Sequence, residues 1–168
     1  MIDRRGFLGS LLAGFVIAPP AAAGVTDWFN GVKLGATMPD HDATFVQGAW
    51  NGSASLVLVD FWATWCAPCI TAIPHLNAIH DRFTAEGLHV VGVSDETVEV
   101  VALFVTRKGM RYAVAAGGER PLRKTLKVRA LPYAMLVDAR RRIVWRGQPE
   151  QLDDATLRAQ LDAVRAAG

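Results

Sequence analysis

The sequence predicts an α/β domain, because strand-like and helix-like segments alternate along most of its length. The apolar, β-branched run 56–61 is typical of a buried strand. Apolar residues then recur at helical spacing over 67–86, and Gly87 stands where helices commonly end. A second apolar run at 88–93 and a second helical segment from Ser94 to Lys108 repeat this order. We therefore predict a central mixed β-sheet with helices on both faces.

The remaining segments extend the same pattern. Asn51-Gly52 is a tight-turn signal ahead of the central strand. Asp95 and Glu96 open the second helical segment, and we interpret them as carboxylates that cap this helix and interact with its dipole. Further strands are predicted at 44–50, 112–115, 134–137 and 143–146, and further helices at 121–127 and 152–166.

The composition is that of one globular domain. Of the 168 residues, 51% are hydrophobic and 20% are charged, which allows a proper hydrophobic core. The formal net charge of +2 is too small to indicate binding to nucleic acid or to an anionic membrane surface. We expect residues 24–168 to form a single domain and the protein to be a monomer.

The first 23 residues predict an export signal rather than part of the fold. Arg4-Arg5 precede an apolar stretch at 7–18, which is too short to cross a bilayer comfortably, and small residues for cleavage follow at 21–23. The pattern Arg-Arg-x-Phe-Leu at 4–8 resembles a twin-arginine export signal. We predict a periplasmic protein, which stays tethered to the membrane if the signal is not cleaved.

Cys66 and Cys69 are the only cysteines, and they lie where the central strand hands over to the first helix. A cysteine attacks a disulfide only as thiolate, and an ordinary thiol, with a pKa of ~8.5, is mostly protonated at neutral pH. The start of a helix stabilises a negative sulfur, and Pro68 suits a first helical turn. We predict that Cys66 attacks the substrate and that Cys69, which should be more buried, closes onto Cys66.

Asp60 interrupts the apolar central strand six residues before Cys66. Because a buried lone carboxylate is costly, it is usually kept for a purpose. We predict that burial raises the pKa of Asp60 and that its carboxylate takes the proton of Cys69. The alternative is that Asp60 faces solvent on an edge strand.

Other uses of the cysteine pair fit the sequence less well. A zinc site needs two further ligands, and the four histidines show no paired ligand spacing. A c-type haem site needs histidine directly after Cys69, where Ile70 stands. We therefore expect no cofactor and no metal.

The stretch from Val59 to Cys69, together with Pro74, resembles the active-site strand and loop of thioredoxin-fold thiol–disulfide oxidoreductases. Over residues 34–166 the chain is most similar to their exported TlpA/ResA-like branch. This resemblance implies a thioredoxin fold, and the Gly-x-x-x-Pro-Asp pattern at 35–40 implies an N-terminal β-hairpin extension. One difference is that this branch usually has asparagine at the position of Asp60 and glutamate at that of Ala72.

The resemblance also implies which residues would meet a substrate. Pro132 matches the cis-proline that faces the active-site disulfide in this superfamily, and an extended substrate would pair with the backbone beside it. The implied substrate-binding residues are Trp65, Ala67, Pro68, Leu131 and Tyr133.

The implied reaction is reduction of protein disulfides in the periplasm, with electrons supplied by a membrane dithiol carrier. Ala67-Pro68 is similar to the Gly-Pro of reducing thioredoxins, which favours this direction. The alternatives are a disulfide oxidase or isomerase, a thiol peroxidase, and a copper-delivering thioredoxin-fold chaperone, whose Cys-x-x-x-Cys is one residue longer than the spacing here.

Overall fold

The computed structural model describes residues 31–118 and 121–167. The predicted export signal at 1–23, and the first residues that would follow its cleavage, lie outside this described part.

In the described part of the chain, six strands form one mixed sheet in the order β1-β4-β3-β2-β5-β6. β2 runs parallel to β3, and β3 parallel to β4, whereas β1, β5 and β6 are antiparallel to their neighbours. β2 is therefore central, and all of its residues are buried, as the apolar run predicted. The strands are β1 (Thr44–Gln47), β2 (Leu56–Phe61), β3 (Leu88–Ser94), β4 (Ala113–Ala116), β5 (Tyr133–Asp138) and β6 (Ile143–Gly147).

The helices follow the predicted order with shorter bounds. The described α-helices are α1 (Ala67–Phe83), α2 (Val98–Lys108), α3 (Leu122–Thr125) and α4 (Asp154–Ala166), with two 3-10 helices, η2 (Thr84–Glu86) and η3 (Pro149–Gln151). Gly87 and Gly109 follow η2 and α2 with positive φ angles of 97° and 62°, the left-handed conformation that favours glycine. None of the helices in these ranges is both long and apolar enough to cross a lipid bilayer.

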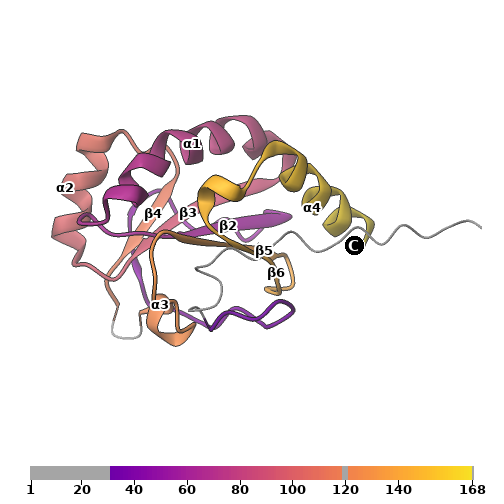
Figure 1. Ribbon diagram of the computed structural model, residues 1–168, viewed down its shortest axis with the longest axis horizontal. Coiled ribbons are helices and arrows are strands. Elements are labelled where there is room, and N and C mark those ends of the chain that lie inside the picture. Colours follow the sequence, from indigo (N-terminus) through magenta and orange to yellow (C-terminus); the bar gives the residue numbers. More distant parts are fainter. Residues whose placement is uncertain (1–30, 119–120, 168) are drawn as a thin grey trace, which may run out of the picture.

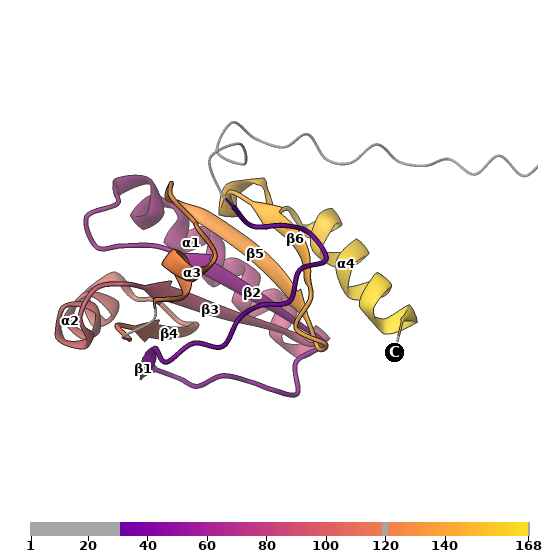
Figure 2. The ribbon, with the colours of Figure 1, turned by 90° about the horizontal axis from the view of Figure 1, so that it is seen from below.

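Alternate side chains of β2 point to opposite faces of the sheet and divide the core in two. Leu56, Leu58 and Trp62 belong to the cluster beneath α1, α2 and α4. Val57, Val59 and Phe61 belong to a second cluster, which α3 and the segment before β1 cover. Figures 1 and 2 show α1 and α4 on one side of the sheet and α3 on the other, which confirms the predicted layers.

The prediction of an N-terminal β-hairpin extension is wrong. In the described part of the chain, the segment before β2 contributes one strand, β1, which pairs with β4. Residues 35–38 instead hydrogen-bond to the end of the β5–β6 hairpin: Gly35 N–H donates to Ile143 O at 2.8 Å, and Met38 N–H donates to Arg141 O at 2.7 Å. The backbone groups that a local hairpin needs are therefore used by residues a hundred positions away.

Candidate active site

The two cysteines form a disulfide at the first turn of α1, with an S–S distance of 2.04 Å and Cα atoms 5.3 Å apart. Cys66 is the N-cap residue of this helix, and its Sγ accepts a hydrogen bond from the Cys69 N–H at 3.3 Å. Pro68 lies in the first turn, and no acidic residue stands there to oppose a thiolate. Because free N–H groups and the positive end of the helix dipole meet at this sulfur, a Cys66 thiolate is stabilised.

The disulfide is recessed behind an exposed rim. Cys66 and Cys69 are 4% and 3% exposed, so the expected difference in their burial is almost absent in the disulfide form. Trp65 is 70% exposed, and Ala67 and Pro68 are exposed beside it. These three side chains therefore form the exposed surface beside the disulfide.

The segment 131–133 emerges at the same end of the sheet as the cysteine loop. The β2–β5 register pairs Phe61 with Tyr133, so Pro132 lies next to the point where β2 runs into Trp62. The Leu131–Pro132 peptide bond is cis. Tyr133 is fully buried in the second cluster. Leu131 is half-buried.

Asp60 lies on the face of β2 that α1 covers, between Leu58 and Trp62 in the alternation of that strand. Its side chain is buried, and Oδ1 has no hydrogen-bond partner among the described residues. Burial, and secondarily the charge of Glu150, raise the pKa of Asp60 from 3.8 to about 8. The alternative that Asp60 faces solvent on an edge strand is wrong, because β2 lies between β3 and β5.

Glu96 holds the cysteine loop in place, a role that the sequence pattern did not predict. Its carboxylate accepts hydrogen bonds from the Thr64 N–H at 2.7 Å and from the Thr64 hydroxyl at 2.6 Å. Thr64 lies two residues before Cys66. The Ser94 hydroxyl donates to the same carboxylate at 3.1 Å. Charge-assisted bonds of this kind fix a loop more firmly than neutral ones. The backbone leading to Cys66 is therefore anchored to the end of β3.

The capping interpretation of Asp95 and Glu96 is wrong. Helix α2 begins at Val98, with Thr97 as its N-cap residue. The Asp95 carboxylate pairs with Arg123 at 2.7 Å. The signal that could have located Glu96 is the parallel pairing of β2 and β3, because parallel strands bring the segments that follow them to the same edge of the sheet.

The sequence is similar to that of known proteins. Residues 36–146 match the AhpC/TSA family. The thiol-disulfide oxidoreductase ResA of Bacillus thuringiensis (strain Al Hakam) is 29% identical over 118 residues, which cover 67% of this chain and 68% of ResA.

Solved structures share the fold at lower sequence identity. The thioredoxin domain of a thiol-disulfide oxidoreductase from Bacteroides vulgatus has a TM-score of 0.64 and 20% identity, covering 79% of this chain and 97% of that chain. A thiol:disulfide interchange protein from Bacteroides sp. has a TM-score of 0.62 and 20% identity, with coverages of 79% and 90%.

The family match spans Asp60, Cys66, Cys69 and Pro132, so it includes the site as well as the sheet. The chain belongs to the AhpC/TSA family and is a thioredoxin-fold thiol–disulfide oxidoreductase of the ResA/TlpA type.

Proposed function

We propose that the protein reduces disulfides of other proteins in the periplasm, with Cys66 and Cys69 as its dithiol. The observation that carries this proposal is a cysteine pair at a helix N-terminus on the same sheet face as a buried, high-pKa carboxylate. The export-signal pattern at 1–23 supports the compartment. A membrane dithiol carrier is the proposed electron donor, because an oxidising compartment converts an unsupplied dithiol to the disulfide.

In the proposed reaction, the Cys66 thiolate attacks one sulfur of the substrate disulfide. A mixed disulfide forms, and the other substrate sulfur leaves as a thiolate. Asp60 then accepts the proton of Cys69, and the Cys69 thiolate attacks the Cys66 sulfur. The second substrate sulfur leaves, so the substrate gains two electrons and the Cys66–Cys69 disulfide is regenerated.

The raised pKa of Asp60 suits this proton transfer. A group with a pKa of about 8 is close to the working pH and close to an ordinary thiol, so it can take the Cys69 proton and release it again. Ala72 carries no ionisable group at the position where the resembled branch has glutamate. We therefore assign the role of proton acceptor to Asp60.

The reduction potential decides the direction. We expect a value near about −270 mV, as in thioredoxin, rather than about −120 mV, as in a strong oxidant. The measurement is equilibration with glutathione buffers, followed by counting of free thiols. Pro68→His is a matched comparison at an exposed position: a histidine cation beside Cys66 stabilises the thiolate and should make the protein more oxidising. A wild-type potential near −120 mV would reverse the proposed direction.

A trapping experiment identifies the substrate class. Cys69→Ala removes the thiol that resolves the mixed disulfide, so this variant should accumulate a covalent adduct with its partner in the cell envelope. Mass spectrometry of the non-reduced adduct names the partner. The double variant Cys66→Ser/Cys69→Ala is the control and should form no adduct. If Cys69→Ala also forms none in the native envelope, the exchange mechanism loses its support.

A further inference from the structure

The ring of Tyr112 lies across strand β3 on the side of Asp60, and the absence of a side chain on Gly92 leaves room for it. Strand β3 lies between β2 and β4, and Gly92 is in register with Asp60 on one side and Val114 on the other. A Cβ atom on Gly92 would lie 3.2 Å from Tyr112 Cε2 and 2.9 Å from Trp62 Nε1. The phenol ring, which begins two residues before Val114, therefore lies over Gly92 on the sheet face that carries Asp60.

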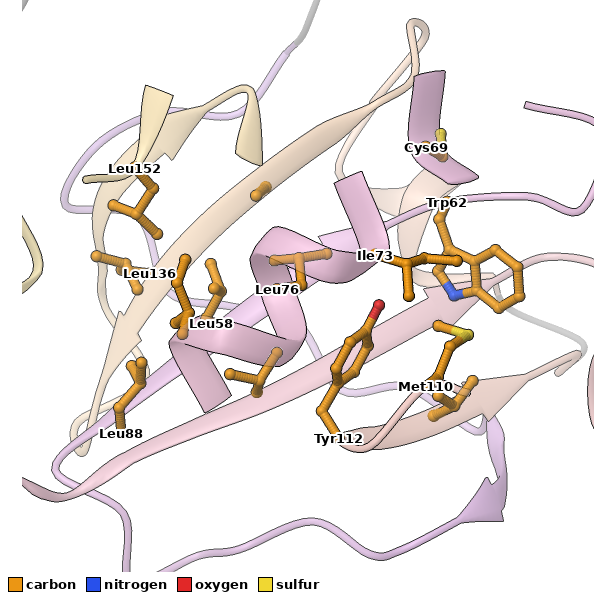
Figure 3. Packing of buried hydrophobic residues seen from close by; sticks show 14 of the residues in the cluster. Leu58, Trp62, Cys69, Ile73, Leu76, Leu88, Met110, Tyr112, Leu136 and Leu152 are labelled. Atoms are coloured by element: carbon orange, nitrogen blue, oxygen red, sulfur yellow. The ribbon is translucent and has the colours of Figure 1, made fainter. Parts of the chain in front are cut away.

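The hydroxyl at the end of this ring is buried and unsatisfied. Tyr112 is 1% exposed, and its hydroxyl has no hydrogen-bond partner within the described residues. Asp60 Oδ1 is in the same situation. Figure 3 shows the Tyr112 hydroxyl pointing toward α1, within the cluster that contains Ile73 and Cys69. Trp62 Nε1, on the same face, also lacks a partner among the described residues. Unsatisfied polar groups in an apolar layer are costly, and a hydrogen bond between Tyr112 and Asp60 removes two of these costs.

We propose that Tyr112 is a positioning residue for Asp60: its hydroxyl donates a hydrogen bond, directly or through one water, to the Asp60 carboxylate when that group is ionised. The bond stabilises the charged form that burial alone disfavours. It thus keeps Asp60 able to accept a proton near neutral pH. This inference rests on the proposed role of Asp60 as proton acceptor.

The charges around Asp60 are consistent with this donor role. Burial, together with the charge of Asp60, raises the pKa of Tyr112 well above its ordinary value, so the phenol keeps its proton at any working pH. Beside burial, the negative charge of Glu150 on η3 raises the pKa of Asp60, because it opposes ionisation. The charge of Asp60 acts on Tyr112, and a phenol hydroxyl can donate a hydrogen bond.

The test is the pKa of Asp60 in Tyr112→Phe. The variant should raise the proton affinity of Asp60 about tenfold, because a hydrogen bond to the charged form is lost while the ring remains. The readout is the ¹³C chemical shift of the Asp60 carboxyl carbon through a pH titration of the oxidised protein. Tyr133→Phe is the matched control: it removes the other phenol, which faces the opposite cluster, and should leave the Asp60 titration unchanged. A Tyr112→Phe titration that overlays the wild type would overturn the inference.

A second variant weakens the proposed Tyr112–Asp60 hydrogen bond without altering Tyr112 itself. In Gly92→Ala the new methyl group displaces the Tyr112 ring from its position over residue 92, so the proton affinity of Asp60 should again rise. An unchanged titration in this variant counts against the inference.

Asp60→Asn separates the inference from the proposed function. If Asp60→Asn does not slow release of the mixed disulfide, proton transfer to Asp60 is refuted, although the Tyr112 bond still shows in the titration. If it slows release while Tyr112→Phe titrates like the wild type, only the inference fails.

Discussion

Replacing Cys66 with serine is expected to lower the rate of insulin disulfide reduction by about 10³-fold or more, to the background of the reductant alone. The serine hydroxyl occupies the same N-cap position but is not ionised near neutral pH, so the helix N-terminus has no anion to stabilise. Cys69 cannot take over the attack on the substrate, because it is buried in the first turn of α1. The measurement is insulin precipitation followed by light scattering with dithiothreitol as electron donor.

A matched control shows whether the loss is specific. Thr106→Ser makes a similarly small change on the exposed side of α2 and should reduce insulin at the wild-type rate. Circular dichroism should show that both variants are folded. A Cys66→Ser protein that still reduces insulin would mean that another group starts the exchange. If the wild type itself shows no turnover, a metal-carrying role for the cysteine pair gains support.

The oxidised protein is expected to lose stability as the pH rises from about 4 to about 8, and Asp60→Asn should remove most of this loss. The folded pKa of Asp60 is about 8, compared with 3.8 for an ordinary aspartate. Between these values the folded chain holds one proton more than the unfolded chain. Each pH unit then lowers the free energy of unfolding by about 1.4 kcal/mol, on the order of 5 kcal/mol in all. Above the folded pKa the loss is complete.

Urea unfolding of the oxidised protein at pH 5 and pH 8 measures this effect. Asparagine is neutral at both pH values. The free energy of unfolding of Asp60→Asn relative to the wild type should therefore be higher at pH 8 than at pH 5. Asp162→Asn, on the exposed side of α4, is the control and should follow the wild type at both pH values. Parallel pH dependence in wild type and Asp60→Asn would show that Asp60 has an ordinary pKa.

The parts of the site that lie close together in sequence were predictable. Cys66, Pro68 and Asp60 belong to one strand-to-helix segment, and their places in the fold follow from the strand pattern and the position of the helix start. Burial of Asp60 could be inferred because its neighbours in the strand are all apolar.

The parts that depend on pairing between distant segments were not predictable in this way. The bond from Thr64 to Glu96 spans 32 positions and exists only because β2 and β3 run parallel. The position of Tyr112 over Gly92 also depends on distant pairing, because the register of β2, β3 and β4 decides which residues lie side by side. The expected hairpin failed because residues 35–38 find their partners near Arg141 and Ile143. A single sequence carries no local signal for such a choice.

The stretch ahead of β2 has a consequence for solubility. Strand β1 pairs with β4, and residues 35–37 bond to Arg142 and Ile143, where β6 begins. The segment before β2 thus covers one side of β4 and the beginning of β6. A chain shortened to begin after Gln47 would leave rows of unpaired amides and carbonyls open to another copy, and unprotected strand borders of this kind promote self-association.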